Sequence, residues 1–586
     1  MYQDQNAQPP PQRGQGVNGY DLATFLGLGG LLVAAGVTSA SLWVSSAIAR
    51  PHPIHVTWGH ALSVWFHLKD MAAWAPPGQQ ANTPPALLLE ATAVVMVVAI
   101  AVVGYVGYKM VKTMLAAPSS SAPTVPASRY REVFGEKALL AKAEVLRPAT
   151  YKAAKAGDAG AKDELKKPGA LGFSVGRPTK FDHVDHMYGS NEDSPLVVGP
   201  PRSGKTTGVV IPRIVEWHGP VLSTSVRRDV ADATVAERDK RGPVFAFDPD
   251  GDLDIEPFRW SLTAGCEDPL IAKRRAGALV TQVGVESMPD GGFFSTSAQS
   301  VLRVLLHAAA LGGLGICDVQ DWLHARDFTI PMRTLRGPDA APNWGASLTR
   351  ILEGEASAQR EGIIQSTVTA LEAFENPKIA ALFSPSKDEA VDLSQFLASN
   401  ATLYITASEN VQRFIAPVIV TIVLELIEAA KMRARGLGRC DPAFLAALDE
   451  VANMAPLPNL AALFSAAGGS GITMLAILQS LGQARERWGP AGAEALWGAA
   501  TVKMIFGGIT NASDLREIAA LAGMADQTSI SHTWSDQGSS TSQGTQKVDR
   551  LTLDTLYSLP VGEALVIARG LPPIQVKTGP APKGSF

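Results

Sequence analysis

Residues 195–212, PLVVGPPRSGKTTGVVIP, constrain this chain more than any other stretch of its sequence. A short apolar run leads into a loop with two glycines, and a second run able to open a helix follows. Backbone N–H groups of such a loop can surround a phosphate, and a Cβ at either glycine would obstruct the tight backbone path. The predicted phosphate-contacting positions are Gly199, Pro200, Pro201, Arg202, Ser203, Gly204, Lys205, Thr206 and Thr207.

Lys205 and Thr206 give this loop the form of a P-loop. A lysine at this position reaches the β- and γ-phosphates of a nucleotide, and the threonine hydroxyl binds Mg²⁺. A plain turn is the competing interpretation, which the apolar strand before the loop and a carboxylate pair later in the chain disfavour. We therefore predict a site for ATP and Mg²⁺.

A second nucleotide motif is predicted at FLAALDE, residues 444–450, an apolar strand that ends in two carboxylates. Burial of the strand places Asp449 at its carboxyl end, the edge where α/β sheets bind ligands. Asp449 is predicted to bind Mg²⁺ with Thr206, and Glu450 to polarise the attacking water. The alternative is that the pair only caps the following helix.

The next predicted strand, 473–478, leads to Gln479 at the same edge. Its amide could hydrogen-bond the γ-phosphate or the attacking water, and a solvent-facing glutamine is the alternative. Lys205, Glu450 and Gln479 are thus the predicted catalytic residues. Phosphoryl transfer also gains from a cation, often contributed by a neighbouring subunit, although a surface salt bridge is the commoner role of an arginine. The candidates for this cation are Arg413, Arg485, Arg487 and Arg516.

After the P-loop, short β-branched or aromatic runs alternate with helical stretches, which predicts an α/β fold. Further strands are predicted at 221–225, 244–247, 403–406, 443–448, 502–506 and 564–568. The pattern from about 314 to 396 is helical, so we expect an all-α domain at 312–398 inserted into one nucleotide-binding domain. The two parts of that domain are expected at 181–311 and 399–575, followed by a short tail, 576–586. The Ser/Thr/Gln/Gly-rich stretch between 526 and 549 is predicted to be a mobile loop.

The N-terminal part carries two apolar runs. Residues 1–20 are rich in Pro, Gln and Gly and are predicted to be disordered. No charged residue occurs from 22 to 48, which as a helix is roughly 40 Å long against a hydrocarbon core of about 30 Å. With the second run, 91–108, this predicts a transmembrane hairpin over 21–112, an extracytoplasmic loop at 49–85 and a cell-membrane location with the ATPase domain in the cytoplasm. A cleaved signal peptide is the alternative for the first run.

Residues 113–180 are expected to form a linker and a basic segment, because 109–182 holds 14 Lys and Arg residues against 7 Asp and Glu. Attraction to anionic lipid headgroups would explain this local positive charge. The alternative is a contact with DNA or a protein partner. The whole chain has a net charge of −4, so any contact with nucleic acid must be local. Its three cysteines are widely spaced and match no metal-binding or redox motif.

These residues together resemble the TraG/TraD-type coupling proteins of conjugative type IV secretion systems, a family of ATPases related to RecA and FtsK. The resemblance covers about residues 20 to 575, and LDEVANMAPLPNL and the closing run are its most specific parts. Besides the two apolar N-terminal runs, it rests on GPPRSGKTTGVVIP, RGPVFAFDPDGDLDIEPFRWSLTAGCEDP, TLYITASENVQRFIAPVI, LDEVANMAPLPNL, ILQSLGQARERWG and VDRLTLDTLYSLPVGEALVIARGLPPI.

The resemblance implies a hexameric ring of RecA-like domains with a helical domain inserted at its mouth. It also implies ATP at the subunit interfaces, a central channel for DNA, and recruitment of the relaxosome, the relaxase–DNA complex delivered to the secretion channel. By position, Lys205 and Thr206 match the family's P-loop residues, Asp449 and Glu450 its second motif, and Gln479 its sensing glutamine.

Two departures from the family pattern limit this transfer. The strand after the P-loop continues as Ser225-Val-Arg-Arg-Asp229, where many members carry an Asp-x-Lys-Gly-Glu run. The chain also ends in GPAPKGSF, without the acidic tail that some members use to dock partners. Substrate recruitment is therefore expected to involve the helical domain or another protein.

The sequence thus predicts a membrane-anchored, Mg²⁺-dependent ATPase that moves single-stranded DNA with its relaxase towards a type IV secretion channel. Three alternatives remain open. The first is an FtsK-like translocase of double-stranded DNA, and the second is a protein-export receptor whose ATPase never contacts DNA. The third is a catalytically silent membrane scaffold.

Overall fold

The computed structural model describes residues 127–179, 186–281, 291–354, 356–535, 538–549, 551–568 and 570–580, together with residue 36, residues 38–49 and scattered positions between 55 and 105. The chain divides into two compact units, Met1–Ser120 and Ser121–Phe586. Each unit is described by itself.

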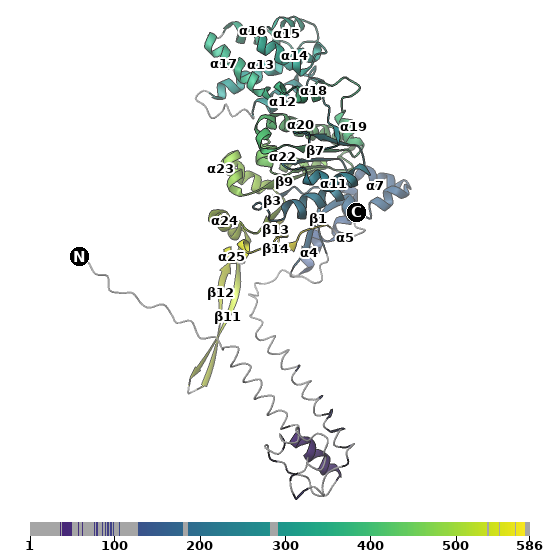
Figure 1. The fold of residues 1–586 in the computed structure, drawn as a ribbon, viewed down its shortest axis with the longest axis vertical. Coiled ribbons are helices and arrows are strands. Elements are labelled where there is room, and N and C mark those ends of the chain that lie inside the picture. Colours follow the sequence, from purple (N-terminus) through teal and green to yellow (C-terminus); the bar gives the residue numbers. More distant parts are fainter. Residues whose placement is uncertain are drawn as a thin grey trace, which may run out of the picture. The chain divides into compact units, whose positions relative to one another are not determined.

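A mixed sheet forms the centre of the second unit (Figure 1). Among the described residues, its strands follow the order β2-β1-β14-β13-β10-β3-β9-β8-β4-β7-β5-β6. Their bounds are β1 (Gly172–Pro178), β2 (Met187–Ser190), β3 (Pro195–Val198), β4 (Val221–Ser225), β5 (Val244–Phe247), β6 (Glu256–Pro257), β7 (Thr402–Thr406), β8 (Phe444–Leu448), β9 (Ile472–Leu478), β10 (Val502–Phe506), β13 (Glu563–Ala568) and β14 (Ile574–Lys577).

The strands from β10 to β6 are parallel, whereas β13, β14, β1 and β2 extend the sheet in antiparallel fashion. Strands β3, β4, β7, β8 and β9 are buried along their whole length. Parallel strands covered on both faces are near-continuous apolar runs, which is why the sequence predicted them well. Because they are parallel, their carboxyl ends lie at one edge, and the P-loop and both carboxylates follow strands that end there.

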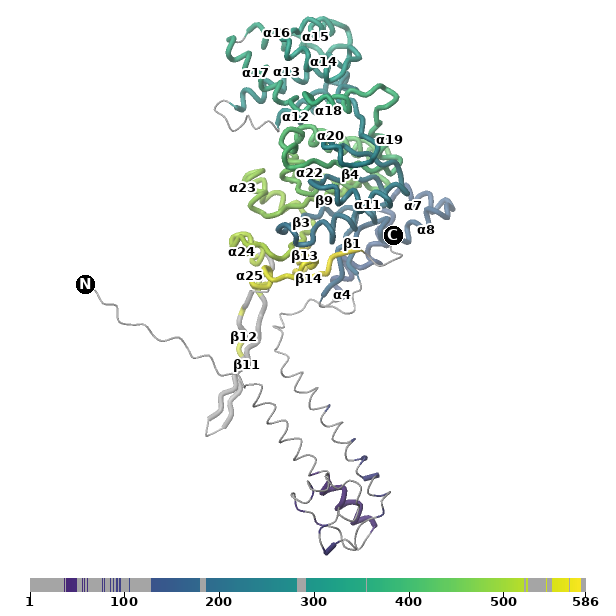
Figure 2. Tube along the Cα trace, viewed as in Figure 1, coloured from purple at the N-terminus to yellow at the C-terminus, as the bar shows by residue number. Residues whose placement is uncertain are grey.

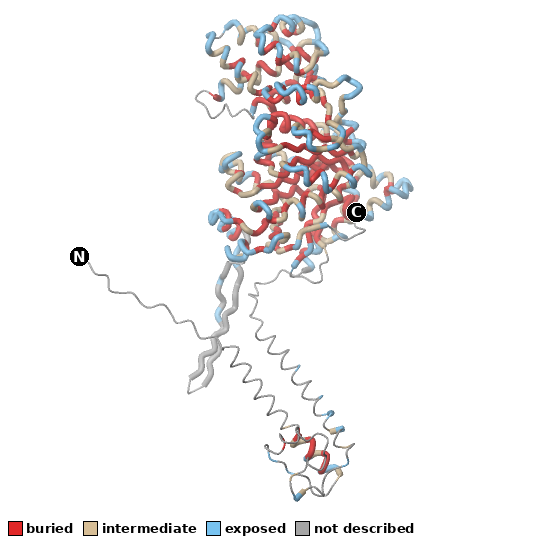
Figure 3. Tube along the Cα trace, in the orientation of Figure 1, coloured by how far each residue is buried: buried red, intermediate tan, exposed pale blue. Residues whose placement is uncertain are grey.

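Helices cover both faces of the sheet, and Figure 3 shows the buried residues concentrated in this layer. Side chains of β3 alternate between two hydrophobic clusters, with Val197 in one and Leu196 and Val198 in the other. The principal covering helices are α10 (Ile211–Glu216), α11 (Asp229–Asp239), α20 (Glu409–Leu437), α22 (Leu460–Ala467), α23 (Leu481–Ala499) and α24 (Ala512–Ala522). The α/β class predicted for the nucleotide-binding part is therefore confirmed.

A group of helices lies between β6 and β7 in sequence and at one end of this unit in Figure 1. Its central helix is α13, which is 21 residues long and is buried on all sides from Val304 to Ala310. It begins before residue 312, so the helical group starts earlier in the chain than expected. The members are α12 (Pro269–Val280), α13 (Gly291–Leu311), α14 (Ile316–Ala325), α15 (Thr329–Thr334), α16 (Trp344–Gly354), α17 (Ser357–Ala370), η6 (Glu372–Glu375), α18 (Pro377–Leu382) and α19 (Leu393–Ala398).

The helical group is not a separate body on a flexible stalk, because its core is continuous with that of the sheet. At their junction Glu425 of α20 accepts hydrogen bonds from Arg274 Nε at 2.6 Å and Arg275 Nε at 3.0 Å. Arg275 also donates to the carbonyl of Leu262 at 2.6 Å. A buried carboxylate held by two guanidinium groups joins α12 firmly to α20.

The described part of the expected linker, from residue 127 on, is folded. It forms α4 (Ala127–Phe134), α5 (Glu136–Leu140), α6 (Ala143–Leu146), α7 (Pro148–Lys155), α8 (Ala159–Glu164) and α9 (Pro168–Leu171) before β1. Buried Arg147 makes an ion pair with Asp441, whose other oxygen accepts a hydrogen bond from the Thr150 backbone at 2.8 Å. Buried side chains such as Tyr130 and Leu146 hold these helices to the sheet, which the basic composition of the segment obscured.

The stretch predicted to be a mobile loop between 526 and 549 forms strands instead. Strands β11 (Met524–Ser535) and β12 (Gly538–Asp549) pair antiparallel along their whole length. Cross-strand backbone hydrogen bonds do not depend on apolar side chains, so a Ser/Thr/Gln/Gly composition did not reveal this hairpin.

The first unit contains the residues predicted to form a membrane hairpin, 21–112. Within the part of the chain that the structure describes, no helix has both the length and the apolar character needed to cross a membrane. This finding contradicts the predicted membrane location with two spans. The rest of the first apolar run, most of the second and the predicted disordered segment 1–20 lie outside the described residues.

Candidate functional site

The P-loop follows directly from the end of β3. The Gly199 N–H donates to the carbonyl of Leu478 on β9 at 3.2 Å, which fixes where the loop leaves the sheet. Within the loop, Arg202 and Gly204 have positive φ angles of 63° and 97°. A Cβ at Gly199 would lie 2.6 Å from Cβ of Phe506, so only glycine fits there.

A π-helical turn, η4 (Thr206–Val210), continues the loop into α10. Such turns within helices often occur at functional sites. Ser203 has a buried hydroxyl with no hydrogen-bond partner in the described structure. An orphaned hydroxyl in a loop of this shape fits a bound phosphate oxygen.

Lys205 is buried, and its Nζ donates to the carbonyl of Pro200 at 2.7 Å. Burial lowers the pKa of Lys205 by disfavouring the charged ammonium, while the nearby carboxylates of Asp449 and Glu450 oppose that effect. The ammonium therefore lies inside the loop, and its contact with Pro200 is one that a phosphate oxygen could replace.

Asp449 lies at the carboxyl end of β8 and is only 7% exposed. Its Oδ2 accepts a hydrogen bond from Thr206 Oγ1 at 3.2 Å, which joins the two predicted metal-binding residues. Burial, followed by the negative charge of Glu450, raises the pKa of Asp449 to about 6, although Thr206 and Lys205 act in the opposite direction. Two adjacent oxygen ligands on rigid elements suit Mg²⁺.

Glu450 adopts a left-handed backbone conformation with φ of 51°, directly before the short helix α21 (Val451–Met454). Gln479, the residue after β9, donates from Nε2 to Glu450 Oε1 at 3.0 Å. The Gln479 N–H in turn donates to Gln483 Oε1 at 3.1 Å. Glu450 is thus oriented by a side chain from the neighbouring strand, an arrangement that suits a residue that positions a water molecule.

The structure therefore brings together five predicted residues, Lys205, Thr206, Asp449, Glu450 and Gln479, at the carboxyl ends of β3, β8 and β9. Thr207 follows on η4, and its hydroxyl donates to the Gly204 carbonyl at 3.5 Å. Pro200, Pro201 and Arg202 form the outer part of the loop, and the side chains of Pro201 and Arg202 are exposed.

The arginine candidates differ in their surroundings. Arg485 donates to Asp514 Oδ1 at 2.8 and 2.7 Å and to Glu517 Oε2 at 3.1 Å. It is therefore held in an ion pair on α23 and α24, the alternative role considered for it. Arg413, Arg487 and Arg516 lie at exposed positions.

Sequence reasoning missed a contact between the P-loop and the C-terminal strands. The Gly562 N–H donates to the Ser203 carbonyl at 3.3 Å, and Thr578 Oγ1 donates to the Gly562 carbonyl at 2.8 Å. Thr578 lies in the stretch expected to be a tail. The contact between Ser203 and Gly562 joins positions more than 350 residues apart, and no local pattern in the sequence marks it.

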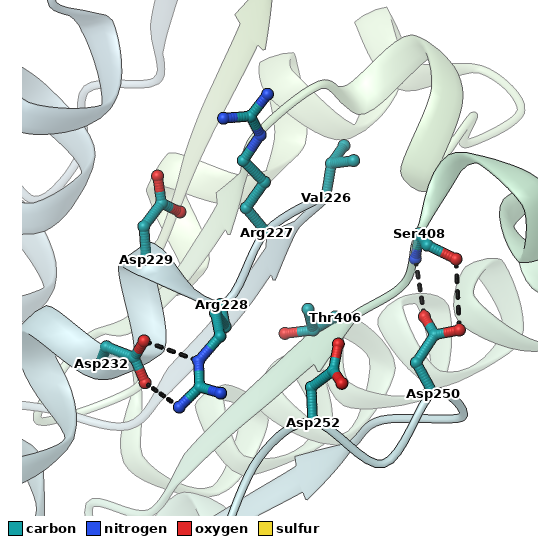
Figure 4. A pocket seen from close by; sticks show the side chains of 9 residues that line it. All are labelled: Val226, Arg227, Arg228, Asp229, Asp232, Asp250, Asp252, Thr406 and Ser408. Atoms are coloured by element: carbon teal, nitrogen blue, oxygen red, sulfur yellow. Dashed lines mark hydrogen bonds and ion pairs between the residues drawn. The ribbon is translucent and has the colours of Figure 1, made fainter.

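A hollow lies at the same edge of the sheet, beside β4, β5 and β7 (Figure 4). Its volume is about 390 Å³, and Arg228 in its wall pairs with both oxygens of Asp232 at 2.8 and 3.1 Å. Asp250 accepts hydrogen bonds from the backbone and hydroxyl of Ser408. This is where the chain departs from the family's Asp-x-Lys-Gly-Glu run, and Arg228 there is engaged by Asp232.

Fold and site together define a P-loop nucleotide-binding α/β protein. Two family models match the chain: "Type IV secretory system Conjugative DNA transfer" at residues 152–260, which include the P-loop, and "TraM recognition site of TraD and TraG" at 443–561, which include Asp449, Glu450 and Gln479. These matches confirm the predicted resemblance to type IV coupling proteins.

Curated relatives agree with the family models. "Conjugal transfer protein TraG" of Agrobacterium fabrum is 24% identical over 396 residues, which cover 63% of this chain and 57% of the relative. "Protein VirD4" of Rhizobium rhizogenes is 23% identical over 316 residues, which cover 50% of this chain and 44% of the relative. The chain thus matches about half the length of these proteins.

Solved structures of the plasmid coupling protein TrwB share the fold. The unbound form has a TM-score of 0.52 at 15% identity, covering 73% of this chain and 94% of that one. TrwB in complex with ADP and Mg²⁺ has a TM-score of 0.50 at 16% identity, covering 67% of this chain and 86% of that one. At this level of identity the likeness shows the fold.

Proposed function

We propose that this chain is the ATP-hydrolysing coupling protein of a conjugative type IV secretion system and brings relaxase-bound single-stranded DNA to the secretion channel. The observation that carries the proposal is the 3.2 Å contact between Thr206 of the P-loop and Asp449 on β8. Two residues 243 positions apart in sequence meet where a metal-bound triphosphate would need them. The two family models, which between them include both residues, support the transfer role.

The chemistry follows from the contacts of these side chains. Lys205 would exchange the Pro200 carbonyl for the β- and γ-phosphate oxygens, while Thr206 and Asp449 would hold Mg²⁺. The metal, when bound, neutralises charge that develops on the phosphate oxygens. Glu450, oriented by Gln479, would position the attacking water and accept its proton.

A homo-hexameric ring is part of the proposal. Arg485 is already held by two carboxylates, so it is poorly placed to move to a γ-phosphate of its own chain. An arginine from a neighbouring copy would complete the site and make hydrolysis depend on assembly. The test is the rate of ATP hydrolysis per chain. We expect this rate to rise with protein concentration until all chains are assembled into rings.

The first experiment compares ATP hydrolysis with no DNA, with single-stranded DNA and with double-stranded DNA. We expect stimulation by single strands that falls as salt increases, because contacts to phosphates release counterions. Stronger stimulation by double strands would favour an FtsK-like translocase. No response to any DNA would favour a protein-export receptor.

The variant that tests the P-loop in this assay is Lys205→Ala, and its control is Lys240→Ala. Lys205 is buried in the P-loop, whereas Lys240 is exposed and pairs with Glu237 on α11. Loss of hydrolysis in the first variant alone assigns the activity to this site. Recruitment of the relaxase is tested separately, by binding of the purified relaxase–DNA complex to the chain, and absence of binding would contradict that part of the proposal.

A further inference from the structure

The direction in which a nucleotide lies in this site follows from the order of the strands. Asp449, Glu450 and Gln479 follow β8 and β9, which lie on one side of the P-loop strand β3. The γ-phosphate must be at this end, because the metal and the attacking water act there. The nucleoside, at the opposite end of the triphosphate, then extends towards the other side of β3, where the sheet continues as β10, β13 and β14.

The chain builds a wall against the P-loop on that side. We call residues 560–562 and Thr578 the C-terminal wall, and Figure 2 shows the strands that carry it, β13 and β14, in yellow. A Cβ at Gly204 would lie 3.1 Å from the Gly562 nitrogen, and one at Gly208 would lie 2.3 Å from Thr578 Oγ1. The wall thus contacts both the turn of the loop and the first turn of the helix after it.

Val561 is the apolar part of this wall. It is 78% exposed, more than any other large hydrophobic side chain in the described part of the chain, and its Cγ1 lies 3.7 Å from the Cβ position of Gly204. A single exposed valine means little by itself. Here it stands beside the phosphate loop, on the side opposite the catalytic carboxylates, where the nucleoside has to lie.

We propose that Val561, with Thr578 beside it, forms the contact surface for the ribose and base of the bound nucleotide. This deepens the proposed function and rests on it, because it names the nucleoside subsite of the same site. A valine covers the face of a base or sugar by apolar contact without reading its hydrogen-bonding edge. The wall therefore adds affinity for a nucleoside while leaving the binding of the phosphates to the P-loop.

The test separates these two parts of the ligand. Equilibrium binding of Mg²⁺–ATP and of Mg²⁺–tripolyphosphate is measured by calorimetry for the parent, Val561→Ser and Val561→Leu. Val145→Ser is the matched control, because Val145 is 61% exposed on α6, away from the P-loop. Since an exposed side chain is changed in each case, we expect every variant to fold.

We expect Val561→Ser to weaken ATP binding about three- to tenfold, the loss of one small apolar contact, and to leave tripolyphosphate binding unchanged. Val145→Ser should bind both ligands as the parent does, and Val561→Leu, which keeps the apolar contact, should bind ATP more tightly than Val561→Ser does. Unchanged ATP affinity in Val561→Ser, or an equal loss for both ligands, would overturn the inference. A parent chain that binds neither ligand would instead refute the proposed function, so the two failures are distinguishable.

Discussion

Asp449→Asn should stabilise the nucleotide-free chain at neutral pH while weakening its binding of Mg²⁺. The pKa of Asp449 is about 6 in the folded chain against an ordinary 3.8, chiefly because the carboxylate is buried and lies beside Glu450. The folded state therefore holds this proton more tightly than the unfolded state. It follows that the charged carboxylate destabilises the fold once the pH rises above the unfolded pKa.

The size of the effect follows from the difference between these two pKa values. A shift of about two pKa units corresponds to roughly 3 kcal/mol, fully present above about pH 7 and absent well below pH 4. Between pH 5 and pH 7.5 the penalty grows by roughly 1 to 1.5 kcal/mol. Asparagine can keep the local hydrogen bonds, because its carbonyl can accept from the Glu450 N–H and its amide can donate to Thr206 Oγ1.

The assay is urea denaturation of the parent and Asp449→Asn, without nucleotide, at pH 5 and pH 7.5. We expect the variant to be the more stable at pH 7.5 and its advantage to be smaller at pH 5. Asp232→Asn is the control, because pairing with Arg228 lowers the pKa of that exposed carboxylate. A gap between parent and Asp449→Asn that does not change with pH, or that widens towards pH 5, would refute this reasoning.

Three further predictions use other contacts. Glu450→Gln should bind ATP as the parent does but hydrolyse it about 10²- to 10⁴-fold more slowly in single-turnover assays. An unchanged rate would show that Glu450 does not activate the attacking water. Gly208→Ala should weaken nucleotide binding and lower stability by about 1 to 3 kcal/mol, because its Cβ would clash with Thr578. The added change Thr578→Ala removes the clashing hydroxyl and should restore the stability. Arg485→Ala should lower the free energy of unfolding by about 1 to 3 kcal/mol, because it leaves buried Asp514 without its cation. Unchanged stability with slower single-turnover hydrolysis would instead give Arg485 a catalytic role.

The parallel part of the sheet was predictable because buried parallel strands are short apolar runs that local patterns reveal. Val221–Ser225 and Val502–Phe506 have the same bounds in the structure as in the sequence prediction. The meeting of the P-loop with Asp449 was also predictable, since both motifs end strands of one parallel sheet and parallel strands share an edge.

What the sequence did not reveal depends on contacts between distant or polar segments. The C-terminal wall lies on the P-loop through backbone atoms of Gly562 and the hydroxyl of Thr578, which no periodicity marks. Strands β11 and β12 are held by backbone pairing in a polar stretch. The prediction of two membrane spans used the length of apolar runs alone, and no helix of the described residues is both long and apolar enough to cross a membrane.

The central claim is that residues of the P-loop and of β8 in one chain hold the same metal-bound triphosphate. Its most direct measurement is Mg²⁺-dependent phosphate release from ATP by the parent, Thr206→Ala and Asp449→Asn, each assayed over a range of Mg²⁺ concentrations. The account predicts hydrolysis by the parent that requires Mg²⁺, and in both variants a strongly reduced rate that only much higher Mg²⁺ partly restores. Hydrolysis by either variant with the parent's rate and Mg²⁺ dependence would contradict it.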